Sequence, residues 1–363
     1  MKVAFISRNT LFTGRGGDTI QMVKTAKYLR DLGVEVDIFT SSEKIDYDKY
    51  DILHGFNVIR PADLLKHFKN FKKVKVLSTI YVNYQEYEAQ SREGLLGLIF
   101  RLLGNNLTEY LKTTARWIIN GEKNFDISYL IFGHKYAFKK LISLSSVILP
   151  NSKSEYLRLA KDYDIVKNYE VIPNAIDQSI FRPDLDISNK QDNLVISVAK
   201  IDGRKNQLNL IRALNNSPFE LIIIGKPAPN HVNFYNQCKR EAAANVSFVT
   251  EIEQEELIKY YLRAKVHAMP SWFETTGLSS LEAVALGCNI VITNKGDTFE
   301  YFGDKAFYCE PDDVTSIYKA VRLASKKKSD ESYRKRVYSE YIWEKTAEKT
   351  LEAYRNCLNS SLH

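Results

Sequence analysis

The stretch VHAMPSWFETTGLSSLEAVALGCNIVIT, residues 266–293, predicts the fold of its half of the chain. An apolar strand over residues 266–269 ends at Pro270, a helix begins near Gly277, and a second apolar strand covers residues 289–293. Strand, helix and strand in this order, with strands that are apolar throughout, predict a parallel sheet covered by helices on both faces.

Two carboxylates, Glu274 and Glu282, stand eight positions apart in this stretch. Glu274 lies in the loop after the first strand, and Glu282 lies inside the helix. The helix N-terminus near Gly277 offers free backbone N–H groups to an anion. A sugar nucleotide fits this order. One carboxylate could bind its sugar hydroxyls, the N–H groups could bind its diphosphate, and the other carboxylate could bind its ribose hydroxyls. Two glutamates near a helix start are by themselves ordinary capping and solvation, so the interpretation depends on the surrounding motifs.

The alternation of strands and helices runs through the chain twice, with a polar, proline-containing stretch over residues 173–192 between the two sets. We therefore predict an α/β protein with two Rossmann-like, doubly wound parallel-sheet domains that face each other across a cleft. The domains cover residues 1–170 and 171–340, and a C-terminal helix over 341–363 crosses back to the first. The predicted strands are 2–7, 34–40, 51–54, 74–79, 146–150 and 169–172, then 193–198, 219–225, 245–249, 266–269 and 289–293.

Two helical segments of the first domain carry further expectations. Ile20, Val23, Ala26 and Leu29 step by three and predict the buried face of a helix that ends at Leu32-Gly33. Residues 86–140 form a helical insertion in which apolar and aromatic residues alternate with cations. This mixture fits an interfacial membrane patch, and it equally fits helices packed on the sheet with cationic side chains at their rim.

The amino-acid composition limits the classes of protein to which the chain could belong. A chain of 363 residues with 44% hydrophobic and 26% charged residues is typical of a folded two-domain protein. Residues 1–9 turn polar too early for a secretory signal, and no run of eighteen apolar residues exists. The four cysteines are scattered without metal-ligand or CxxC spacing, which favours reduced thiols and a cytoplasmic location. The net charge of +7 lies mostly in the first 180 residues and fits an anionic membrane surface or phosphate-bearing substrates.

Three motifs together resemble the family 4 (GT4) retaining glycosyltransferases, which have the GT-B fold. They are VIPNAID at 171–177, SVAKIDGRKNQ at 197–207, and the paired glutamates of 274–282. The resemblance covers nearly the whole chain and is most specific between 171 and 300. Two departures occur: Ala175 stands where the family usually has Gly, and Ala199-Lys200 stands where it usually has Gly-Arg.

The resemblance assigns catalytic roles to Glu274, Lys205 and Lys200. Glu274 would contact the hydroxyls of the donor sugar. Lys200 and Lys205 would neutralise the charge that grows on the departing β-phosphate, so that no metal is strictly required. Lysine cannot form the bidentate fork of arginine, and Arg204 is a candidate for the missing guanidinium, although its place next to Lys205 turns it elsewhere.

Further residues are expected to bind the substrate. Glu282 would hold the ribose hydroxyls, and backbone N–H groups near Gly277 would meet the diphosphate. In the first domain, a family histidine that contacts the donor sugar is replaced by Tyr81, and His54 at another strand end is a candidate substitute. The remaining predicted substrate-binding residues are Gly16, Gly17, Gly225, Ile252, Thr275, Thr276 and Leu278.

Together with these residues, the resemblance implies a retaining hexosyltransferase that uses a UDP- or GDP-sugar and acts on a glycan or lipid-linked acceptor in polysaccharide or glycoconjugate synthesis. The cationic first domain favours a location in the cytoplasm or at the inner face of the membrane, with peripheral membrane contact. We expect no cofactor, and the DxD letters at 46–48 and 162–164 have surface settings. We expect no nucleic acid partner, because the cations lack interleaved aromatic residues. A sugar-nucleotide epimerase and a non-catalytic sugar- or nucleotide-binding module remain the alternatives.

Overall fold

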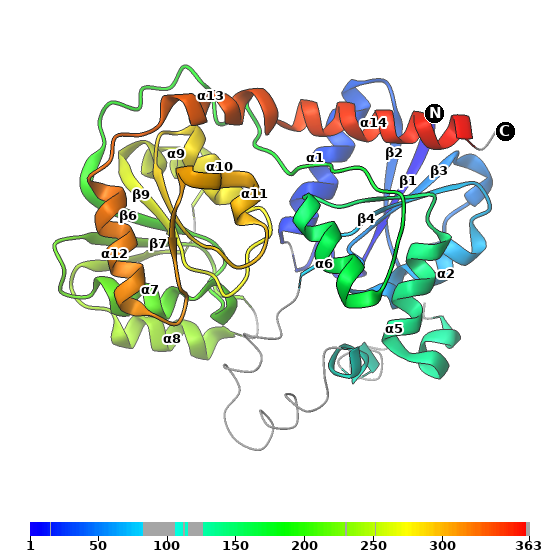
Figure 1. Ribbon diagram of the computed structural model, residues 1–363, viewed down its shortest axis with the longest axis horizontal. Coiled ribbons are helices and arrows are strands. Elements are labelled where there is room, and N and C mark those ends of the chain that lie inside the picture. The colour runs from blue at the N-terminus through cyan, green and yellow to red at the C-terminus, as the bar shows by residue number, and fades with distance from the viewer. Residues whose placement is uncertain are drawn as a thin grey trace. The chain divides into compact units, whose positions relative to one another are not determined.

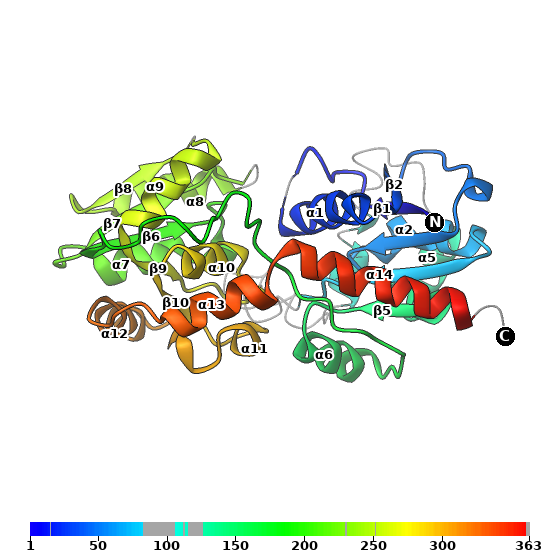
Figure 2. The same cartoon turned by 90° about the horizontal axis from the view of Figure 1, so that it is seen from above.

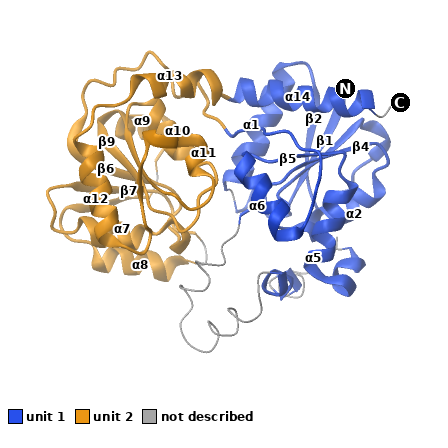
Figure 3. Ribbon diagram, viewed as in Figure 1, with its two compact units in different colours: residues 1–174, 343–363 blue, residues 175–342 orange. Residues whose placement is uncertain are grey.

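The computed structural model describes residues 1–14, 16–82, 106–111, 113–114, 126–228, 231–250 and 252–360. It divides into two compact units, one of Met1–Asn174 with Trp343–His363 and one of Ala175–Ile342 (Figure 3). The sequence places the corresponding boundaries at 170/171 and 340/341. Most of the predicted helical insertion, including the apolar run at 94–104, lies outside the described residues.

The first unit, hereafter unit 1, contains a five-stranded parallel sheet in the order β2-β1-β3-β4-β5 (Figure 1). Its strands are β1 (Lys2–Ser7), β2 (Glu35–Thr40), β3 (Ile52–Phe56), β4 (Val74–Ser78) and β5 (Val147–Leu149). Within its described residues, the helices are α1 (Gly17–Asp31), α2 (Pro61–Asn70), α5 (Ile127–Leu144), α6 (Lys153–Tyr163) and α14 (Trp343–Ser360), and a 3-10 turn, η1 (Tyr47–Lys49), precedes β3. The last helix comes from the end of the chain and packs beside α1 (Figure 2).

Successive residues of the unit 1 strands serve opposite faces of the sheet, because side chains alternate along a strand. Ala4 and Leu53 pack in one apolar cluster with the buried side chains of α2, α5 and α6. The neighbouring residue His54 points the other way and meets Tyr354 of α14. Both faces are therefore covered by helices, as a parallel sheet requires.

The second unit, hereafter unit 2, contains a six-stranded parallel sheet in the order β11-β10-β9-β6-β7-β8. Its strands are β6 (Gln191–Val198), β7 (Glu220–Ile224), β8 (Val246–Val249), β9 (Ala264–Met269), β10 (Asn289–Thr293) and β11 (Phe307–Cys309). Its helices are α7 (Gln207–Leu214), α8 (Val232–Glu241), α9 (Gln254–Arg263), α10 (Leu278–Ala285), α11 (Thr298–Phe302), α12 (Val314–Ser325) and α13 (Glu331–Glu340), with 3-10 turns η2 (Gly203–Lys205) and η4 (Gly303–Lys305).

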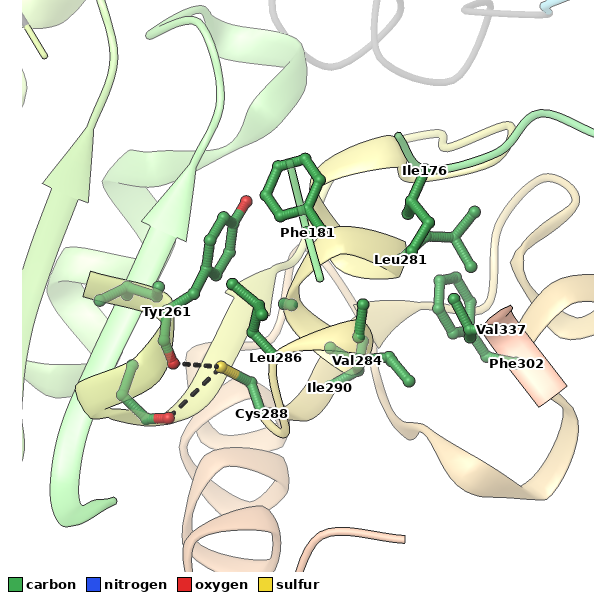
Figure 4. Packing of buried hydrophobic residues seen from close by; sticks show 14 of the residues in the cluster. Ile176, Phe181, Tyr261, Leu281, Val284, Leu286, Cys288, Ile290, Phe302 and Val337 are labelled. Carbon is green, nitrogen blue, oxygen red and sulfur yellow. Dashed lines mark hydrogen bonds between the residues drawn. The ribbon is translucent and has the colours of Figure 1, made fainter. Parts of the chain in front are cut away.

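Apolar clusters cover both faces of this sheet. Val195 and Leu221 belong to one cluster, and their strand neighbours Ile196 and Ile222 belong to the other. Figure 4 shows part of the second cluster, where the buried thiol of Cys288 approaches the carbonyl oxygens at the end of α9. The predicted fold class, two doubly wound parallel α/β domains, is confirmed by the two sheets.

Two local predictions are wrong, and one short strand was not predicted. In α1, Ile20 and Val23 are exposed, whereas Ala26 and Leu29 are buried as predicted, and the buried residues also include Met22. Residues 169–172 form a single bridge from Tyr169 to Ile148 rather than a strand. Strand β11, which is only three residues long, was not predicted.

None of the helices that the structure describes combines the length and apolar character needed to cross a bilayer. The four cysteines are free thiols, and Cys238, Cys288 and Cys309 are buried.

Candidate functional site

Glu274 lies in the loop between β9 and α10, and its backbone is fixed by the loop that follows β10. The Glu274 N–H donates to the carbonyl of Lys295 at 3.0 Å, and the Asp297 N–H donates to the carbonyl of Glu274 at 2.9 Å. Gly296 between these partners has φ +105°, and a Cβ there would come within 2.0 Å of the Glu274 carbonyl oxygen. Only glycine allows this approach, so the position of the glutamate depends on it.

Lys205 and Glu274 form an ion pair at the carboxyl edge of the unit 2 sheet. Lys205 Nζ lies 2.6 Å from Glu274 Oε2, to which Ser271 Oγ also donates at 3.2 Å. The carboxylate is largely buried, with 8% of its side chain exposed, while 29% of the lysine side chain is exposed. The two residues follow β6 and β9, which are neighbours in the sheet. The structure thus brings together two of the three predicted catalytic residues.

The turn that carries Lys205 is built on Asp202. Its Oδ1 accepts the Arg204 N–H at 2.7 Å, and its Oδ2 accepts Arg204 Nη2 at 2.7 Å. Burial acts to raise the pKa of Asp202, but the guanidinium and the N–H donor hold it below the ordinary value. The Arg204 side chain is therefore directed at Asp202, as its place in the sequence suggested.

The helix α10 begins directly behind Glu274. Gly277 precedes it in the left-handed region with φ +68°, and Leu278 is its first residue. Thr275 and Leu278 are half-buried. Thr276 is fully buried, and its Oγ1 donates to the Tyr301 hydroxyl at 3.3 Å. The side chain of Thr276 therefore supports the loop from inside, and the backbone of this segment forms the helix start.

Glu282 lies in the second turn of α10 and is half-buried. Its Oε2 accepts a hydrogen bond from the Tyr261 hydroxyl at 3.0 Å. Burial, followed by the negative charge of Glu282, raises the pKa of Tyr261 well above its ordinary value, so the phenol remains a donor. Tyr261, which is labelled at the left of Figure 4, orients the second glutamate, and no feature of the sequence pointed to it.

The other predicted residues of unit 2 have more varied settings. Lys200 is exposed, and its backbone carbonyl accepts from Gln207 Nε2 at 2.9 Å. Gly225 has φ +148°, and a Cβ there would come within 1.9 Å of the Ala199 carbonyl oxygen, so its glycine is required by this backbone contact. Ile252 is half-buried and packs against the unit 2 core.

In unit 1, the glycine loop before α1 is organised by Arg8, a residue that no sequence motif indicated. The Arg8 guanidinium contacts both carboxylate oxygens of Asp18, at 2.7 and 3.0 Å, and donates to the carbonyl oxygens of Thr10 and Gly14. Burial opposes it, but Arg8 and other donors lower the pKa of Asp18.

The two predicted glycines lie at the end of this loop. Gly16 is the N-cap of α1, and Gly17 is its first residue. Both therefore stand at the amino end of a fifteen-residue helix.

His54 and Tyr81, which were predicted to contact the substrate, lie in the interior of unit 1. The His54 ring nitrogens meet the Tyr354 hydroxyl at 2.5 Å and Ser78 Oγ at 2.9 Å, and burial lowers its pKa to about 3. The Tyr81 hydroxyl donates to Asp162 at 2.6 Å, and burial raises its pKa. Side chains that are 1% and 2% exposed, with their polar atoms engaged inside the protein, serve the fold.

The match to a known protein family lies within the part of the chain that forms unit 2. Residues 181–341 match the family model described as "Glycosyl transferases group 1". Glycogen synthase from Mycobacterium tuberculosis is 32% identical over 114 residues, which are 30% of this chain and 28% of that protein. The chain therefore matches little more than a quarter of the length of this relative.

Two solved structures share the fold over nearly the whole chain. Sucrose-phosphate synthase from Thermosynechococcus elongatus has a TM-score of 0.75 and 16% identity, covering 99% of this chain and 100% of that one. HepE from Anabaena, solved in complex with UDP-glucose, has a TM-score of 0.63 and 13% identity, covering 98% and 100%. The predicted GT-B fold is thereby confirmed.

Proposed function

We propose that this protein transfers a hexose from a nucleotide diphosphate sugar to a hydroxyl group, since residues 181–341 match the family model described as "Glycosyl transferases group 1". The observation that carries the proposal is the Lys205–Glu274 pair beside the amino end of α10. A cation, a buried carboxylate and backbone N–H groups are the groups that a sugar diphosphate needs. A binding module would have no need to bury a glutamate next to a lysine at this edge.

The chemistry follows from the charges that develop. The bond from the anomeric carbon to the β-phosphate oxygen breaks, and a bond to the acceptor oxygen forms on the same face of the sugar, which retains its configuration. The departing phosphate takes the proton of the acceptor hydroxyl. Lys205 and Lys200, with the N–H groups of α10, neutralise the phosphate without a metal ion. Glu274 binds the hydroxyls of the sugar, and Glu282 binds those of the ribose.

We propose UDP or GDP as the nucleotide. The structural similarity to HepE, which was solved with UDP-glucose, supports UDP. A nucleotide of either kind presents ribose hydroxyls, from which Glu282 would accept hydrogen bonds.

The first test is nucleotide release from UDP-, GDP-, ADP- and dTDP-sugars by the purified protein, with and without glycan acceptors. We expect release from one donor, reduced by about 100-fold or more in Glu274→Ala, because the carboxylate acts on the reacting sugar. Glu256→Ala, at an exposed carboxylate of α9, is the matched control and should retain full activity. Equal rates in Glu274→Ala and wild type would contradict the assignment, and binding without turnover would favour a non-catalytic module.

We further propose that the acceptor is lipid-linked and that unit 1 contacts the cytoplasmic face of the membrane. Helix α5 supports this, because it exposes Ile127, Ile131 and Phe132 close to Lys135 and Tyr136. Apolar and aromatic side chains beside cations are typical of interfacial membrane helices.

Flotation with liposomes tests the membrane contact. We expect binding to vesicles with anionic lipid, lost in the double variant Ile131→Ser/Phe132→Ser. Phe299→Ser, at an exposed aromatic residue of unit 2, is the control and should float like wild type. No flotation of the wild type with anionic lipid would exclude the contact.

A further inference from the structure

Asn206 directly follows Lys205 and joins three strand-end loops of unit 2. Its backbone has φ +60° and ψ 32°, in the left-handed region that asparagine tolerates better than most residues. The side chain is buried, with 4% exposure, and its Nδ2 donates to the carbonyl of Pro270 at 2.9 Å and to that of Pro311 at 2.6 Å. Pro270 follows β9 and Pro311 follows β11, so one amide group fixes both loops against the turn of Lys205.

The contact with Pro270 bears on the Lys205–Glu274 pair, because each partner stands on one of the joined loops. Pro270 begins the loop that leads to Glu274. A second bond joins the same two loops, from the Trp272 N–H to the Arg204 carbonyl at 2.9 Å. Two hydrogen bonds beside the pair therefore set the position of the Lys205 ammonium relative to the Glu274 carboxylate. One is made by the side chain of Asn206, and the other joins two backbone groups.

Asparagine suits this position for two reasons. Its NH₂ group carries two N–H donors, one for each carbonyl. Aspartate has the same shape but only acceptor oxygens, which would repel both carbonyls. Glycine adopts the same backbone conformation but supplies no donor.

We propose that Asn206 is a positioning residue, whose side-chain amide holds Lys205 at the distance from Glu274 that the reaction needs. The structural part of the proposal concerns only the ion pair. Its catalytic consequence rests on the proposed function.

The first experiment observes the ion pair directly and does not depend on activity. Protein labelled with ¹⁵N-lysine should show the Lys205 ammonium resonance, assigned by its loss in Lys205→Arg, because the hydrogen bond to Glu274 slows its proton exchange. We expect this resonance to persist in Asn209→Ala and to shift or vanish in Asn206→Gly and Asn206→Asp. Asn209 Nδ2 donates to the same Pro311 carbonyl at 2.9 Å and is the matched control. An unchanged resonance in both Asn206 variants would overturn the proposal.

The second experiment measures turnover in a double-mutant cycle. We expect kcat of Asn206→Gly to fall by about 100-fold with little change in KM for the donor, since small misplacements of catalytic groups act on the transition state. The double variant Lys205→Ala/Asn206→Gly should be no slower than Lys205→Ala, because Asn206 acts through that lysine. Losses that multiply would assign Asn206 a general role in stability and overturn the inference. Absence of turnover from any donor would contradict the proposed function, and the lysine resonance would still decide the role of Asn206.

Discussion

Among single residues, Gly225 leaves the least room for a side chain at the edge of the unit 2 sheet. A Cβ at this position would lie 1.9 Å from the Ala199 carbonyl oxygen, and φ is +148°. We expect Gly225→Ala to lower the free energy of unfolding by roughly 3 kcal/mol or more, since both the backbone contact and the conformation oppose a side chain. Urea titration followed by circular dichroism measures this loss.

A second glycine of unit 2 allows the effect of the backbone contact to be separated from the effect of the positive φ. Gly303 also has a positive φ, +49°, but an added Cβ would meet no atom within 4 Å. Gly303→Ala should therefore cost only the conformational strain, about 1–2 kcal/mol. Equal losses in both variants would mean that the contact of Gly225 with Ala199 adds nothing.

His54 predicts a dependence of stability on pH. Burial lowers its pKa to about 3 in the folded protein, whereas the unfolded chain has the ordinary value near 6.5. Below pH 6.5 the unfolded chain therefore takes up a proton that the folded protein does not bind, and stability falls as the pH falls. The expected contribution is about 1.4 kcal/mol per pH unit between about pH 6 and 4. The slope of unfolding free energy against pH should decrease by this amount in His54→Gln, and an equal slope would contradict the burial effect.

Glu155 connects two elements of unit 1, the end of β4 and the start of α6. Its Oε1 accepts from the Tyr81 N–H at 2.8 Å and from Thr79 Oγ1, and its Oε2 accepts from the Asn151 N–H at 3.0 Å. Glu155→Gln would place an NH₂ group against one of these donors. We expect a loss of about 2–3 kcal/mol in unfolding free energy, against no measurable change for Glu352→Gln on the exposed face of α14. A stable Glu155→Gln protein would show that the loop after β4 can rearrange.

The elements themselves were largely predictable, because buried parallel strands are recognised by their runs of apolar, β-branched residues. Helix faces were less so. Ile20 and Val23 fit the helical spacing but are exposed, and the buried face of α1 packs beside α14 from the far end of the sequence. A local pattern holds no information about so distant a partner. Strand β11 was missed because three residues, Phe307–Cys309, are too few for a period to show.

Considered as a whole molecule, the candidate site was predictable where its chemistry lies in short motifs. Lys205 and Glu274 come from two such motifs, and the sheet order makes them neighbours. The supporting residues were not predictable, since Asn206 and Tyr261 act through contacts 64 and 21 positions away in the sequence. The buried position of His54 was unpredictable for the same reason, because its partner Tyr354 is 300 positions distant.

The division into two units predicts that each loses stability separately. Tyr354 of α14 is fully buried in unit 1, and Tyr301 of α11 is 2% exposed in unit 2. Replacing either by alanine removes a buried aromatic side chain, which typically costs about 3–5 kcal/mol. Hydrogen exchange should show faster exchange of β1 and β3 in Tyr354→Ala, with β6 and β7 unchanged, and the reverse pattern in Tyr301→Ala. Faster exchange in all four strands for either variant would mean that the chain unfolds as one cooperative body, because local openings report the unit that contains them.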